Sequence, residues 1–206
     1  MKIYQNFFKK GVAICDPFCY YNHVPNKRYG LKGNEIMAYV SKDRKVTIKN
    51  DIDGSLKEHG FGNKVKYSMK IEHYSTLVLN IKSCHVDLKE NLLNRLNERK
   101  NELLESGCYG VREMEMIENY ISKNEKIDVD SEWNRDLNFH YHSKGSKEDL
   151  GKFFTGEALD VLWAIHEAVH KDWYDESDAM TDYFNVDFYF TLKIGDNKGG
   201  FSVIKK

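Results

Sequence analysis

Proline, long apolar runs and a charge excess of one sign are all scarce in this sequence, and each scarcity excludes a class of protein. The 206 residues include two prolines, Pro17 and Pro25, which excludes a proline-rich or collagen-like chain. No stretch approaches the roughly eighteen apolar residues of a membrane span. The first ten residues lack the apolar run and cleavage site of a signal peptide. These features predict a cytoplasmic protein that does not contact a membrane.

Cysteine and net charge exclude further classes. The formal net charge of -1 gives no overall basic field, so the sequence carries no strong signal for nucleic-acid binding. The four cysteines, Cys15, Cys19, Cys84 and Cys108, lack the second closely spaced pair of a zinc ribbon, and we interpret them as reduced thiols. A hydrophobic fraction of 41% is sufficient for a substantial core.

One short motif carries a chemical mechanism. His166-Glu167-Ala168-Val169-His170 matches H-E-x-x-H, and over these five residues the chain resembles zinc peptidases. On a helix the two histidines lie one turn apart on the same face, where both imidazoles could bind one zinc ion. Glu167 would then be the general base that activates a zinc-bound water.

A third zinc ligand is harder to identify. Glu176 occupies the position of the last histidine in the longer H-E-x-x-H-x-x-G-x-x-H pattern, but Trp173 replaces the glycine that makes the turn. The expected metal set is therefore His166, His170 and Glu176. Further candidates for the third ligand are Asp178, Asp182, His140 and His142.

Residue periodicity in the first half predicts strands followed by helices. Residues 35–50 suggest a hairpin, with strands at Met37–Val40 and Lys45–Ile48. Residues 64–72 alternate apolar and charged side chains, and residues 77–81 form a more buried run, so two further strands are expected. Leucines at helical spacing from Leu88 to Gly107 predict a helix, and residues 111–123 predict a second.

The second half is expected to contain a connector, a strand, a helix and a hairpin. Residues 124–133 suggest a polar connector, and residues 137–141 suggest a strand with His140 and His142 on one face. Ser146 begins a helical region that extends to about Tyr174, with a break near Gly151 or Gly156. Residues 186–204 suggest a terminal hairpin.

Together these elements predict an α+β fold. We expect a mostly antiparallel sheet with a helical hairpin and one long helix from the C-terminal half packed on it, ending in a β-hairpin. The chain should form a single domain over residues 1–206. Its parts would be a β-rich region (1–87), the helical hairpin (88–125) and a strand–helix–hairpin region (126–206).

For function we favour a non-catalytic, cytoplasmic protein-binding or inhibitor protein without a cofactor. A compact chain, abundant aromatic residues and an incomplete catalytic set support this hypothesis. The composition is typical of AT-rich genomes and suggests a bacteriophage or mobile element whose protein acts on a host defence protein. Exposed aromatics are expected at Tyr20, Tyr21, Trp173 and Tyr174. The alternative is a zinc-dependent, peptidase-like hydrolase using the H-E-x-x-H motif.

Overall fold

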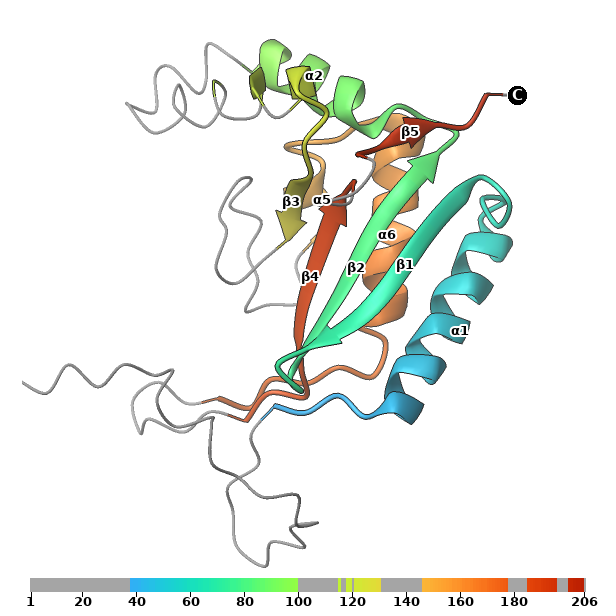
Figure 1. Cartoon of the computed structure of the whole chain (residues 1–206), viewed down its shortest axis with the longest axis vertical. Coiled ribbons are helices and arrows are strands. Elements are labelled where there is room, and N and C mark those ends of the chain that lie inside the picture. Colours follow the sequence, from blue (N-terminus) through green and yellow to red (C-terminus); the bar gives the residue numbers. More distant parts are fainter. Residues whose placement is uncertain are drawn as a thin grey trace, which may run out of the picture. The chain divides into compact units, whose positions relative to one another are not determined.

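A five-stranded sheet organises the part of the chain that the structure describes (Figure 1). The computed structural model describes residues 38–99, 115, 118–119, 121–130, 146–177, 185–195 and 200–205. These belong to one compact unit, residues 36–206. The strands are β1 (Val65–Glu72), β2 (Thr76–Cys84), β3 (Ile127–Asp130), β4 (Tyr189–Ile194) and β5 (Ser202–Val203). The helices are α1 (Lys42–Glu58), α2 (Leu88–Glu98), α5 (Lys147–Leu150) and α6 (Gly156–Val169).

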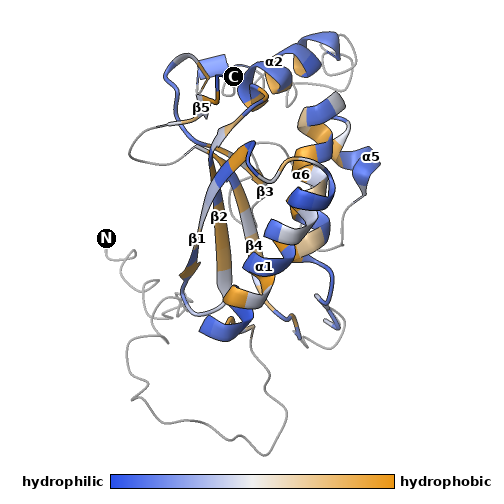
Figure 2. Cartoon of the chain, turned by 90° about the vertical axis from the view of Figure 1, so that its right-hand side faces the viewer, coloured by the Kyte–Doolittle hydropathy of each residue, from blue (hydrophilic) through white to orange (hydrophobic). Residues whose placement is uncertain are grey.

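The sheet is ordered β1-β2-β4-β3, and β5 pairs with the end of β2. Antiparallel pairing joins β1 to β2 and β3 to β4, whereas β4 and β5 run parallel to β2. Helices α1 and α6 pack together on one face of the sheet (Figure 2). The predicted α+β class with a mostly antiparallel sheet is confirmed. Within the described residues, no helix is long and apolar enough to cross a membrane.

The alternation in β1 and β2 follows the prediction because one face of the sheet is buried. Leu77, Leu79 and Ile81 are 0% exposed and belong to the core beneath the helices. Burying three such side chains contributes about 1.5–3 kcal/mol each to folding. The residues between them point to the other face. The pairing of β1 with β2 contains an irregularity: Tyr67 is opposite Ile81, whereas Lys66 is opposite Ser83, so one residue of β2 between them has no partner in β1.

The predicted hairpin over residues 35–50 is wrong, because residues 42–58 form helix α1. Ser41 caps its start: its side chain accepts a hydrogen bond from the Arg44 amide at 2.9 Å. The helix buries Ile48, Ile52 and Leu56, spaced four residues apart. The short β-branched run Val46–Ile48 is thus part of an amphipathic helix whose apolar stripe continues to Leu56.

The C-terminal hairpin is also wrong in its pairing. β4 and β5 do not pair with each other; both lie alongside β2, β4 at residues 76–81 and β5 at residues 83–84. The predicted polar connector 124–133 is wrong in part, because Ile127–Asp130 forms strand β3 beside β4. Ile127 and Val129 are buried, so a two-residue apolar period was present in this segment.

The two helices predicted over residues 88–123 hold in position, but the first is shorter than expected, because α2 ends at Glu98 with Arg99 as its C-cap rather than near Gly107. Helix α2 begins at Leu88, and Asp87 caps it by accepting hydrogen bonds from the amides of Lys89 and Glu90. The described residues of the second predicted helix, Glu115, Glu118, Asn119, Ile121 and Ser122, are helical. The predicted strand 137–141 lies outside the described residues.

The helical region of the C-terminal half is broken where glycine suggested it would be. Ser146 caps the start of the short helix α5, which ends at Leu150 with Gly151 as its C-cap. Helix α6 starts at Gly156 and ends at Val169, before the predicted end at Tyr174. As expected, its apolar side is buried: Leu162 and Val169 are 0% and 1% exposed.

A buried lysine holds α2 to the start of β3 and to the segment before β5. Lys89 is 5% exposed, and its Nζ donates to Asn124 Oδ1 at 2.8 Å and to the Glu125 carbonyl at 2.5 Å. Burial lowers the Lys89 pKa, although the charges of Asp87 and Glu125 oppose this. Asn124 also accepts from the Phe201 amide at 3.3 Å. These bonds satisfy polar groups that burial would otherwise leave costly.

Tyr67 joins the edge strand β1 to α1 and provides a test of this packing. Its hydroxyl donates to Asp53 Oδ1 at 2.6 Å, and Lys49 pairs with the same carboxylate at 2.5 Å. Burial, followed by the hydrogen bond to Asp53 and its negative charge, raises the Tyr67 pKa far above its usual value of 10.0. The neutral hydroxyl is therefore favoured in the folded state.

We predict that Tyr67→Phe lowers the free energy of unfolding by about 1–2 kcal/mol at neutral pH, through loss of this hydrogen bond. A raised folded-state pKa contributes stability that is complete below the unfolded value of 10.0 and is lost as the pH rises above it. Denaturant unfolding of both proteins should therefore show a constant difference from pH 7 to 9 and a smaller one above pH 10. Lys89 is present in both proteins, so its titration changes both free energies of unfolding equally and does not alter their difference. If the free energies of unfolding of the two proteins differ as much at pH 11 as at pH 7, the hydrogen bond from Tyr67 to Asp53 does not stabilise the fold as described.

Candidate functional site

The H-E-x-x-H segment forms the last turn of α6. His166 is 2% exposed and His170, which follows the last helical residue, is 7% exposed. Glu167 is exposed to solvent. The helix therefore directs both histidines into the core and the glutamate outward. A general base has to reach a water on the metal that the histidines bind, so this arrangement separates the three groups that the motif would combine.

Both imidazoles lie in a continuous group of aromatic rings. Trp163 stacks on His166 with ring centroids 5.4 Å apart, and His166 lies beside His170 at 4.1 Å. His170 also meets Trp173 at 5.3 Å and Phe190 at 5.5 Å, both edge to face. Such contacts stabilise aromatic packing beyond simple burial. Since Phe190 belongs to β4, the histidines help to fix α6 to the sheet.

The ring nitrogens of His170 have defined roles. Its Nδ1 lies 2.8 Å from the His166 carbonyl oxygen, which can only accept, so Nδ1 carries the proton in this bond. In the neutral ring, Nε2 then holds the lone pair. Zinc-bound histidines often donate their other ring nitrogen to a backbone carbonyl in this way. His170 alone therefore fits either a packed histidine or a zinc ligand.

Glu176, the predicted third ligand, makes a different contact. Its Oε2 accepts a hydrogen bond from Asn185 Nδ2 at 2.8 Å, and its amide donates to the Asn185 carbonyl at 2.8 Å. Within the residues that the structure describes, no three His, Cys, Asp or Glu side chains come together as a metal site. The other proposed third ligands, Asp178, Asp182, His140 and His142, lie outside those residues.

The aromatic residues predicted for a binding surface separate into three groups. Tyr20 and Tyr21 lie outside the described residues. Trp173 is 7% exposed and donates its indole N–H to the Phe188 carbonyl at 2.8 Å, so the structure places it in the core. Tyr174 is 40% exposed. Of these four aromatics, Tyr174 is the one that the structure places at the surface.

Two further exposed tyrosines, which sequence reasoning missed, belong to segments that backbone hydrogen bonds link to the segment of Tyr174. Tyr39 is 61% exposed and Tyr74 is 76% exposed. The Tyr39 amide donates to the Asp187 carbonyl at 3.1 Å, and the Asp187 amide donates to the Tyr174 carbonyl at 3.0 Å. The Val40 amide donates to the Tyr74 carbonyl at 2.8 Å. We call Tyr39, Tyr74 and Tyr174, with these backbone bonds, the tyrosine end.

Ion pairs fix the tyrosine end to α1. Arg44, in the first turn of α1, pairs with Asp187 at 3.0 Å and donates to the Asp172 carbonyl at 3.3 Å. The Arg44 and Asp187 side chains are 26% and 17% exposed, so the pair is partly shielded from water and stronger than an open surface pair. Segments from four parts of the chain are thus held in one arrangement, so their backbone needs little ordering on binding.

The turn that carries Tyr74 is strained. His73 and Tyr74 have φ values of 52° and 63°, in the left-handed region that non-glycine residues rarely adopt. Each such residue costs about 1–2 kcal/mol. Tyr74 is largely exposed, so little burial of its ring offsets this cost. Strain of this kind is concentrated at functional sites, and the observation marks the turn as a candidate site.

A Cys–His–Glu arrangement at the far end of β2 has the contacts of a catalytic triad but not its access. Cys84 Sγ lies 3.5 Å from His85 Nδ1, and His85 Nε2 lies 3.3 Å from Glu157 Oε2. Cys84, however, is 0% exposed, and burial raises the pKa of its thiol. A catalytic cysteine needs an accessible thiolate. We therefore interpret Cys84 as a core residue, in agreement with its predicted reduced state.

Comparison with family models, curated proteins and solved structures finds no match to this chain. The candidate sites therefore rest on their own geometry. Of these, the tyrosine end combines exposure, a fixed backbone and strain at Tyr74. The histidine pair is buried, and the Cys84 thiol is inaccessible.

Proposed function

We propose that this chain is a non-catalytic protein-binding or inhibitor protein, and that the tyrosine end contacts its partner. One observation carries the proposal: three exposed tyrosines from distant parts of the chain are brought together by backbone hydrogen bonds. Tyrosine is enriched at the centres of protein interfaces, where its ring is buried and its hydroxyl finds a polar partner.

The surroundings of the three rings favour a protein partner over a small molecule. Small-molecule sites are concave and largely apolar, whereas these tyrosines are 40–76% exposed. Asp172 and Glu176, both exposed, flank Tyr174 and supply a polar rim. A rigid tyrosine surface of this type resembles the contact surfaces of antibodies in composition, with few rotatable bonds to order on binding.

An inhibitor acting in the cytoplasm on a host defence protein is the biological role that we infer for this surface. Such a protein needs no catalytic set, because occupying a partner's functional surface is sufficient. The composition, typical of AT-rich genomes such as those of many bacteriophages, supports an origin in a phage or mobile element. No cofactor is required for this role.

We predict that replacing Tyr39, Tyr74 and Tyr174 together by Ala abolishes partner binding. Interface anchors contribute about 1–2 kcal/mol or more each, so affinity should fall at least about a hundredfold. Partners captured from the native host with wild-type bait would be produced separately and measured by calorimetry. Val203→Ser, at an exposed apolar site on β5 (40% exposed), is the control and should bind normally. Unchanged affinity of the triple variant at an unchanged melting temperature would rule out the tyrosine end.

Tyr74→Gly separates function from folding at the same turn. Glycine adopts positive φ without the side-chain penalty, so the variant should be more stable by about 0.5–1 kcal/mol after the entropy of glycine in the unfolded state is deducted. It also removes the exposed ring, so binding should weaken. Thermal unfolding and calorimetry would measure the two effects. A variant that gains stability and binds normally would show that the ring has no role in binding.

The second candidate is a zinc-dependent hydrolase, supported by the neighbouring rings of His166 and His170 and by the Nδ1 bond of His170. If it is correct, His166, His170 and a third side chain would hold the ion, which would supply an activated water. Because Glu176 is bound to Asn185 and Glu167 points to solvent, we predict no stoichiometric zinc in protein purified without an affinity tag. Stoichiometric zinc that is lost in His166→Ala, with hydrolysis abolished in Glu167→Gln, would establish the hydrolase instead.

A further inference from the structure

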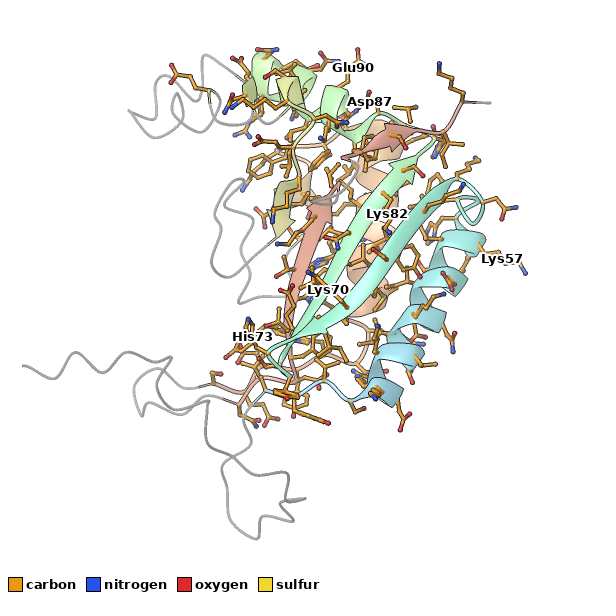
Figure 3. The ribbon with its side chains drawn as sticks, viewed as in Figure 1. Lys57, Lys70, His73, Lys82, Asp87 and Glu90 are labelled. Atoms are coloured by element: carbon orange, nitrogen blue, oxygen red, sulfur yellow. The ribbon has the colours of Figure 1, made fainter. Side chains whose placement is uncertain are left out.

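We draw no further inference here: the strongest candidate, the outer edge of the sheet along strand β1, where Figure 3 labels Lys70, carries no proposal, because nothing in the described part of the structure shows what would pair with this edge, and lysines such as Lys66 and Lys70 are side chains that protect edge strands from pairing.

Discussion

Burial of one face of β2 beneath α1 and α6 is the constraint on which the rest of the structure depends. Leu77, Leu79 and Ile81 are fully buried there, and β2 pairs with β1, β4 and β5. Since successive side chains of a strand point to opposite faces, this burial also fixes which residues remain outside. It directs the lysines of β1, β2 and β4 to one surface. Function has to be sought among the residues that remain outside.

The same burial determines the meaning of the H-E-x-x-H motif. The apolar stripe of α6 has to face the sheet, and His166 and His170 lie on that stripe with Trp163 and Phe190 around them. A one-residue displacement along the helix changes direction by roughly 100°, so Glu167 is turned outward. The five-residue motif thus fixes the spacing of the two histidines along the helix, but the surrounding apolar residues decide whether the histidines face solvent or the core.

Several elements were predictable because their local signal agrees with the tertiary structure. The alternation of β1, the start of α2 at Leu88 and the helix start at Ser146 are local signals, and the structure has all three where the sequence predicts them. Helix α1 was missed because Val46–Ile48 alone has the composition of a strand, and its helical period needs the window to reach Leu56. The pairing of β5 with β2 depends on contacts across more than a hundred residues, which no local pattern contains.

The tyrosine end shows the same limit for function. Tyr174 could be suggested from an acidic, aromatic segment, but nothing in the sequence distinguishes Tyr39 and Tyr74 from other tyrosines of the chain. Their significance comes from two tertiary facts. The backbone of Asp187 bonds to Tyr39 and to Tyr174, and the β1–β2 turn that carries Tyr74 adopts positive φ.

That turn joins β1 to β2 directly after Glu72, so the tyrosine end includes the tip of the β1–β2 hairpin. A tight two-stranded turn normally uses glycine or asparagine at positive φ. Placing histidine and tyrosine there instead lowers stability within the surface that we propose for partner binding. The hairpin is therefore the element in which the demands of folding and of binding conflict most directly.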